Sequence, residues 1–122
     1  MIKSHIEKEK KLTVHTCTGK ITAEELVNAI KGFYDGELTA DNLWDLTGAD
    51  VSSLKSDEIR QLAYFVKSYA PPKKTGKTAI VSSKDIAFGF SRMYQTFAGL
   101  SGQQVEVQVF RSLEEANEWL SG

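Results

Sequence analysis

The feature that most constrains the fold of this chain is a regular alternation of strand-like and helix-like segments. Residues 105–110, VEVQVF, alternate apolar and polar side chains, as a strand with one face in water does. Residues 77–82, KTAIVS, form another short apolar run, and apolar residues recur at helical spacing between the two runs. Strands that alternate with helices favour a mainly parallel sheet with covered faces.

Capping and helix-breaking residues indicate where the helices begin and end. The predicted N-caps of the four helices are Thr22, Ser56, Ser83 and Ser112. A glutamate follows the first and last of these after three positions, which completes two capping boxes. The pair Pro71 and Pro72 stops the second helix. The third helix, over about residues 84–99, has a stripe predicted to face the core: Ile86, Phe90, Met93, Phe97 and Leu100.

A hairpin is predicted at the start of the chain, where IKSHIE and LTVHTCT flank the charged turn KEKK. The expected architecture is an α/β fold with an N-terminal hairpin plus four β-α units. Its five-stranded sheet is mainly parallel, with helices covering it. No internal repeat or low-complexity segment divides the chain, so residues 1–122 are expected to form a single domain.

The composition is that of a water-soluble domain, with 41% hydrophobic and 25% charged residues. No apolar run approaches the ~18 residues of a transmembrane helix, and residues 1–12 lack the apolar core of a signal peptide. A cytoplasmic protein is therefore expected. Cys17 is the sole cysteine, so an internal disulfide is impossible, and we interpret it as a small strand side chain.

The segment PPKKTGKTAIV, residues 71–81, contains the GKT that ends a phosphate-binding P-loop. A P-loop needs another glycine five positions before Gly76, but Pro71 stands there and has no N–H to donate. The motif is also followed by a predicted strand, whereas a P-loop opens a helix. We therefore interpret this segment as a helix stop and a turn, not as a nucleotide site.

Basic and aromatic residues are concentrated in one half of the chain. Residues 59–113 hold eight Lys/Arg against two Asp/Glu, together with eight of the twelve aromatic residues. Residues 1–58 are acidic, with eleven Asp/Glu against seven Lys/Arg. A basic, aromatic face suits an anionic membrane surface or a nucleic acid. No recognised RNA- or DNA-binding motif is present, so no nucleic-acid partner is expected.

Four stretches carry a resemblance to a known family: residues 43–50 (LWDLTGAD), 62–71 (LAYFVKSYAP), 77–99 (KTAIVSSKDIAFGFSRMYQTFAG) and 105–120 (VEVQVFRSLEEANEWL). Over nearly its whole length from about Leu12, the chain resembles the SpoIIAA-like family of small bacterial proteins. That family shares its fold with STAS domains. The resemblance implies the fold described above and brings no catalytic signature or cofactor with it.

The better-known members of this group carry a serine that is phosphorylated within an Asp-Ser-Ser-Gly context. The matching residues here are LKSDEI, in which Ser56 and Asp57 occupy the places of the two serines and no glycine follows. An aspartate cannot accept phosphate from a serine kinase, so the usual phosphoswitch lacks its central residue. The family fold also looks like the lipid-binding Sec14-type domains, in which a mobile helix covers an apolar pocket.

These observations predict a non-enzymatic domain that binds a lipid-like or other apolar ligand and associates reversibly with membranes. The third helix and the helix before Pro71 are expected to cover the pocket, with joints at residues 68–77 and at Gly99. The expected ligand-binding residues are Leu62, Phe65, Tyr69, Phe90, Met93 and Phe97. The expected membrane-contact residues are Lys73, Lys74, Lys77, Lys84, Phe88 and Arg92.

The main alternative is a protein-interaction module of the anti-sigma-factor-antagonist type that docks a regulatory partner through residues 50–60. A homodimer is a further alternative.

His5 and His15 could lie across the hairpin near Cys17, but no fourth ligand is evident. No metal site is therefore predicted, and both histidines are expected to face solvent. Asp45 lacks a base or nucleophile nearby, and we expect it to accept hydrogen bonds from the following loop.

Overall fold

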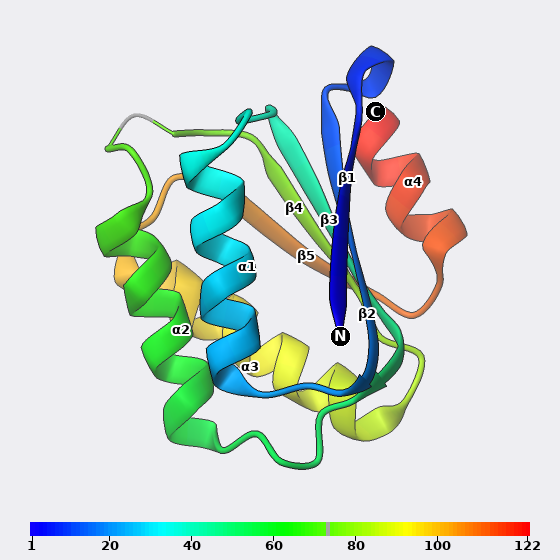
Figure 1. Cartoon of the computed structure of the whole chain (residues 1–122), viewed down its shortest axis with the longest axis vertical. Coiled ribbons are helices and arrows are strands. Elements are labelled where there is room, and N and C mark those ends of the chain that lie inside the picture. Colours follow the sequence, from blue (N-terminus) through cyan, green and yellow to red (C-terminus); the bar gives the residue numbers. More distant parts are fainter. Residues whose placement is uncertain (73) are drawn as a thin grey trace.

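The computed structural model describes residues 1–72 and 74–122. Figure 1 shows an α/β fold in which a first strand precedes four β-α units, as predicted. The elements are β1 (Ile2–Glu7), a 3₁₀ turn η1 (Lys8–Lys10), β2 (Leu12–Lys20), α1 (Ala23–Asp35), β3 (Asp41–Asp50), α2 (Ser56–Tyr69), β4 (Lys77–Val81), α3 (Asp85–Ser101), β5 (Glu106–Phe110) and α4 (Leu113–Ser121).

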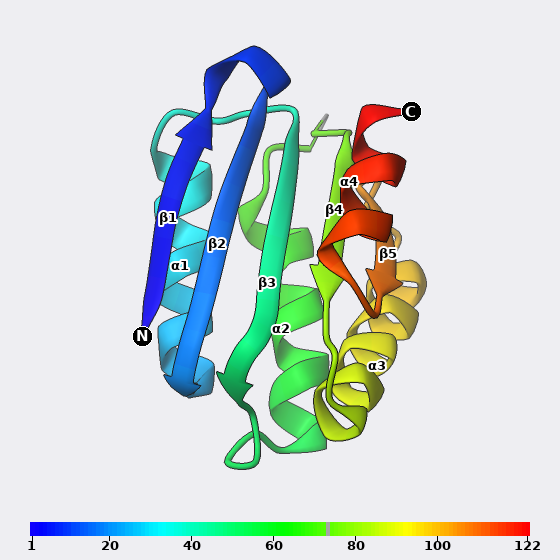
Figure 2. The same cartoon turned by 90° about the vertical axis from the view of Figure 1, so that its right-hand side faces the viewer.

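The five strands form one sheet in the order β1-β2-β3-β4-β5, so each strand lies beside its neighbours in the sequence. Only the β1–β2 pair is antiparallel, and the other three pairs are parallel. Helices α1, α2 and α3 cover one face of the sheet, and α4 lies on the other (Figure 2). The prediction of a mainly parallel, helix-covered sheet is therefore confirmed.

Alternation along the strands divides the buried side chains between the two faces of the sheet. The larger core lies between the sheet and α1–α3 and includes Ile21, Ile59 and Val66. The smaller core lies beneath α4 and includes Val81 and Ala116. Burial on both faces explains why β4, which has a strand on each side, ends in the continuous apolar run of residues 79–81.

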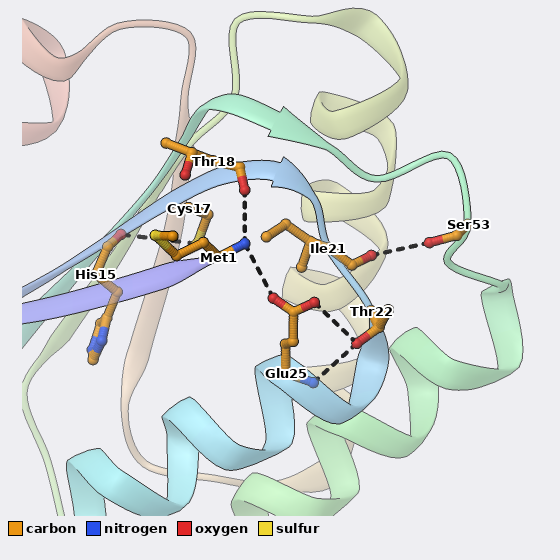
Figure 3. Close-up of polar contacts among 8 residues, drawn as sticks. All are labelled: Met1, His15, Cys17, Thr18, Ile21, Thr22, Glu25 and Ser53. Atoms are coloured by element: carbon orange, nitrogen blue, oxygen red, sulfur yellow. Dashed lines mark hydrogen bonds and ion pairs between the residues drawn. The ribbon is translucent and has the colours of Figure 1, made fainter.

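The predicted N-caps of α1 and α4 are confirmed. The Thr22 hydroxyl accepts a hydrogen bond from the backbone N–H of Glu25 at 3.2 Å, and that of Ser112 accepts from the N–H of Glu115 at 3.3 Å. Figure 3 shows the first of these caps, where the ammonium group of Met1 also lies 3.2 Å from the Glu25 carboxylate. In both α1 and α4, the helix thus begins directly after a residue whose hydroxyl accepts a hydrogen bond from a free N–H of the first turn.

The other two predicted caps, Ser56 and Ser83, are wrong. Helix α2 begins at Ser56 itself, because the carboxylate of Glu58 reaches back to accept the N–H of Lys55 at 2.9 Å. Helix α3 has Lys84 as its N-cap. The guanidinium group of Arg111 donates to the Ser83 carbonyl at 3.3 Å, which holds this residue outside the helix.

The predicted core stripe of α3 is confirmed in its middle, where Phe90, Met93 and Phe97 pack against the core, and is wrong at its two ends. Its end residues are exposed, Ile86 at 64% and Leu100 at 71%, and its middle residues are only half-buried. The helix turns its small residues Ala87, Ser91 and Ala98 inward instead. Small side chains allow a helix to approach the sheet closely, and the Ser91 hydroxyl is 2.7 Å from that of Ser82. The fully buried residues of α3 therefore each follow a residue of the predicted stripe by one position.

The segment after α2 contains a turn that leads into β4, which confirms that its GKT is not a P-loop. Gly76 has a φ of +122°, and a Cβ atom there would overlap the carbonyl oxygen of Ala40. Glycine is required at this position because the backbone conformation and the close approach both exclude a side chain. Gly99, expected as a joint, lies within α3, which ends at Ser101 and is followed by the C-cap Gly102 with a φ of +79°.

Candidate apolar ligand site

A cavity of about 100 Å³ lies between the sheet and helices α1, α2 and α3. Strands β3 and β4 contribute Trp44 and Ile80 to its wall, and the helices contribute mainly aliphatic and aromatic side chains. The principal helical contributors are Ile30, Phe33, Ile59, Leu62, Val66 and Phe90. The inward face of α3 helps to leave this space, because Ala87 and Ser91 fill little volume where the cavity forms.

Polar side chains on the sheet floor of the cavity are satisfied by one another. Asn42 donates to the Thr78 hydroxyl at 2.8 Å and accepts from the Trp44 indole N–H. On α3, the Ser91 hydroxyl donates to the carbonyl of Ala87 at 2.7 Å. These groups line the cavity without leaving a buried donor or acceptor that would oppose an apolar occupant.

Two phenols and a carboxamide, from Tyr34, Tyr94 and Gln103, form a second polar group in the wall. Burial raises the pKa of both tyrosines, and for Tyr94 the neighbouring Tyr34 raises it further while Gln103 opposes the rise. Burial disfavours the charged phenolate, so both side chains remain neutral at physiological pH.

His15 lies behind the cavity wall and is fully buried, so the prediction that it faces solvent is wrong. Its ring stacks on Trp44 with centroids 3.9 Å apart and meets the edge of Phe33 at 5.6 Å. Nδ1 lies 2.7 Å from the Ser4 hydroxyl, while Nε2 has no partner within residues 1–72 and 74–122. Burial, followed by the charge of His5, lowers the pKa of His15 to about 4.

The two histidines do not share a face of the hairpin. His15 pairs with Ser4 across the strands, and His5 pairs with Val14, so the imidazoles point to opposite sides. His5 is exposed, as expected. No group of three or more metal-ligating side chains occurs in the described part of the chain. Cys17 is buried, and burial raises the pKa of its thiol to about 12, which makes it unreactive.

Two of the six expected ligand-binding residues, Leu62 and Phe90, line the cavity. Three others, Phe65, Met93 and Phe97, pack against the same core without reaching the cavity. The sixth, Tyr69, is exposed, stacks on Phe65 and donates to the Asp35 carboxylate at 2.7 Å.

Sequence reasoning missed Tyr34, Trp44 and Tyr94 as cavity residues. Strand alternation places Trp44 on the same face as Asn42, opposite Leu43, and is the signal that could have found it.

The expected membrane-contact lysines near the start of β4 hold internal contacts. Lys74 donates to the carbonyl of Ala40 at 2.8 Å. Lys77 donates to the carbonyl of Trp119 at 2.9 Å, and its ammonium lies 5.2 Å from the centre of that indole ring, on the α4 side of the sheet. Lys73 lies outside the described residues.

Of the remaining three expected contacts, Lys84 is the N-cap of α3, shortly after the other end of β4, and Phe88 and Arg92 lie on that helix. Lys84 and Arg92 are exposed. Phe88 is half-buried beneath the guanidinium group of Arg111, which lies 3.9 Å from its ring centre and pairs with Asp85 at 2.8 Å. The described basic residues are therefore divided between the two ends of β4 rather than gathered on one plane.

Asp45 has the local structural role expected from the sequence. Its carboxylate accepts hydrogen bonds from the backbone N–H and the hydroxyl of Thr47, at 3.0 and 2.7 Å. These contacts lie at the shift in register between β2 and β3, next to the pairing of Thr16 with Asp45. The carboxylate thus stabilises an irregular stretch of strand.

No family model and no curated protein matches this chain. Within the described residues, no helix has both the length and the apolarity needed to cross a membrane.

Proposed function

We propose that this chain is a non-enzymatic domain that binds a small apolar ligand between the sheet and helices α1–α3. The observation that carries this proposal is the cavity of about 100 Å³, whose wall is mostly apolar. Ligand pockets are typically apolar with a few placed polar groups, and this cavity has that composition. Among the described residues, its wall contains no carboxylate, histidine, lysine or cysteine, and Asp45 is not part of it.

The volume of the cavity indicates the size of the ligand that it can hold. An apolar cavity of about 150 Å³ holds benzene, so about 100 Å³ suits a single ring or a short branched chain after small side-chain movements. A longer lipid-like ligand requires α2 and α3 to separate. The sequence joins α2 to β4 through Pro71, Pro72 and Gly76, which is where such a movement would be absorbed.

The SpoIIAA-like or STAS-like assignment is part of this proposal. It is supported by the order of the elements, a first strand followed by four β-α units, and by the placement of three successive helices on one face. The likeness to Sec14-type domains gives the same location for an apolar ligand, under the helices that cover the sheet.

The test of ligand binding is a titration with benzene, followed by amide chemical shifts. Binding should shift the signals of residues around the cavity, including Trp44 and Leu62. Replacing Ala87 with leucine should abolish the response because the larger side chain fills the cavity. Leu100→Ala is the matched control, since Leu100 is 71% exposed at the far end of the same helix. A wild-type protein without shifts would contradict the proposal.

Reversible association with anionic membranes is the second part of the proposal. Ile86, 64% exposed and close to the exposed Lys84, supports it as an apolar residue beside a basic one. A basic residue near an anionic leaflet contributes about 1 kcal/mol, so attachment should be weak and sensitive to salt. Co-sedimentation with neutral and anionic vesicles tests this, with Phe88→Ala beside wild type. Protein that stays in the supernatant throughout rejects membrane association and leaves the ligand proposal standing.

A protein-interaction module is the alternative, and the exposed first turn of α2 favours it. Asp57 there is 81% exposed at its side chain and makes only a surface pair with Arg60, at 3.4 Å. Substitutions at Ser56 or Asp57 should abolish docking of a regulatory partner without affecting benzene binding. A pull-down with the wild-type chain and Asp57→Arg distinguishes the two functions.

A further inference from the structure

The cavity wall in the described residues contains no charged side chain. All of its polar atoms belong to neutral groups: the indole of Trp44, the carboxamides of Asn42 and Gln103, and the hydroxyls of Thr78, Ser91, Tyr34 and Tyr94. Moving an ionised group from water into such surroundings without a counter-charge is strongly unfavourable. An occupant of this cavity is therefore uncharged where it meets the wall.

Most of the polar wall atoms already have partners within the protein, but two phenols have spare capacity. Asn42, Thr78 and Trp44 bond to one another, and Ser91 bonds to the backbone of its own helix. Within residues 1–72 and 74–122, the Tyr34 hydroxyl makes no hydrogen bond to the protein, and only the neighbouring Gln103 approaches that of Tyr94. Gln103 itself is anchored weakly, donating to the Ala63 carbonyl at 3.4 Å.

The two phenols come from different helices, Tyr34 from the end of α1 and Tyr94 from the middle of α3, and both line the cavity. Both side chains also pack against the same core cluster, which surrounds the cavity. Each hydroxyl can donate one hydrogen bond and also accept. Together with the Gln103 carboxamide, they form a neutral polar corner in an otherwise apolar wall.

We infer that the ligand is a neutral, ring-sized molecule whose single hydroxyl or carbonyl group hydrogen-bonds to Tyr34 and Tyr94. This inference rests on the proposed function and makes it more specific, because it excludes fatty-acid anions and other carboxylates from the cavity. The apolar body of the ligand contacts Phe33, Trp44, Leu62 and Phe90.

The test compares three probes of similar size: benzene, benzyl alcohol and benzoate, each titrated into the full chain and followed by amide chemical shifts. One net hydrogen bond contributes about 0.5–1.5 kcal/mol, or about two- to tenfold in affinity. Tyr94→Phe and Tyr34→Phe should each weaken benzyl alcohol binding by about that factor and leave benzene binding within about twofold. Benzoate should show no shifts around the cavity.

Tyr69→Phe is the matched control, because its hydroxyl bonds to Asp35 on the surface, away from the cavity. It should leave the binding of all three probes unchanged. Benzene binding in each variant also reports whether the cavity is still folded. If Tyr94→Phe loses its fold, Tyr34→Phe supplies the same comparison from another helix.

The possible results distinguish a failure of this inference from a failure of the proposed function. If benzene fails to bind wild type, the proposed function falls and the inference falls with it. If benzene binds while benzoate binds as tightly as benzyl alcohol, the neutral-ligand inference is overturned and the apolar site stands. If both tyrosine variants lose equal affinity for benzene and for benzyl alcohol, the phenols only shape the cavity and do not hydrogen-bond to the ligand. That result also overturns the inference.

Discussion

The two faces of the sheet are covered differently. Under α4, side chains such as Ala79, Val81 and Ala116 are completely buried in a small core, and the hollow at its edge is lined by charged residues including Asp41 and Glu118. Under α1–α3, the larger core encloses an apolar cavity.

An unfilled apolar space loses the contacts that its lining would otherwise make. The comparison shows that the cavity lies only on the face covered by α1, α2 and α3, called here the three-helix face, within the described residues. A ligand bound there would restore those contacts. The predictions below test this difference, beginning with the largest expected effect.

The largest effect concerns His15, which belongs to the three-helix face. Its pKa is lowered from 6.5 to about 4, so the unfolded chain binds a proton more readily than the folded one. The free energy of unfolding should therefore be highest above about pH 6.5 and should fall as the pH drops toward about 4, by about 3 kcal/mol. Urea unfolding near pH 7 and near pH 4 measures this loss.

His15→Phe should remove most of that pH dependence, because phenylalanine preserves the stacking on Trp44 and does not titrate. His5→Gln is the control and should retain the dependence, since His5 is exposed. An unchanged pH dependence in His15→Phe would show that another group causes it.

The next effect compares one substitution on the two faces. Ala79→Leu, under α4, should lower the free energy of unfolding by about 1–3 kcal/mol because the added atoms have no space. Ala87→Leu, at the cavity, should leave it unchanged or raise it, since the same atoms enter an existing void. Thermal unfolding of both variants measures the difference. Equal destabilisation would contradict a fillable cavity.

A smaller effect tests whether the covering helices depend on their caps. Thr22→Ala and Ser112→Ala should each lower the free energy of unfolding by about 1 kcal/mol, because each removes the acceptor of a free N–H. Ser83→Ala should have little effect, since Ser83 lies outside α3 and caps nothing with its side chain. Denaturant unfolding of the three variants measures these changes, and a Ser83→Ala loss as large as the others would contradict this assignment.

The smallest effect concerns the surface pair of Arg111 with Asp85. The Asp85 side chain is 94% exposed, and exposed pairs contribute about 0–1 kcal/mol. Asp85→Asn should therefore change thermal stability slightly, and by less at high salt. Arg111→Ala should cost more, because it also removes the contact over Phe88. Melting curves at low and high salt separate the two contributions, and equal effects would show that the ring contact adds nothing.

Much of the fold could be predicted because local patterns report it directly. The alternating residues of β5, the buried run of β4 and the caps at Thr22 and Ser112 all specify structure over a few positions. The candidate site was harder to predict from the sequence. Leu62 and Phe90 were predicted at the pocket, but Phe65 and Tyr69 follow the same helical pattern and stay outside it. The side chains that reach the cavity depend on how closely each helix approaches the sheet, and that distance is set by tertiary packing.

The sequence by itself determined the alternation of strands and helices, the mainly parallel sheet and the exclusion of a P-loop at residues 71–81. These properties follow from backbone chemistry and from spacing within short segments. Only the tertiary structure decided that α3 turns Ala87 and Ser91 inward, that His15 is buried, and that Tyr34 and Tyr94 line one cavity. The physical reason is that close packing depends on the sizes of side chains that come from distant segments of the sequence. Those side chains contact one another only after the helices have docked on the sheet.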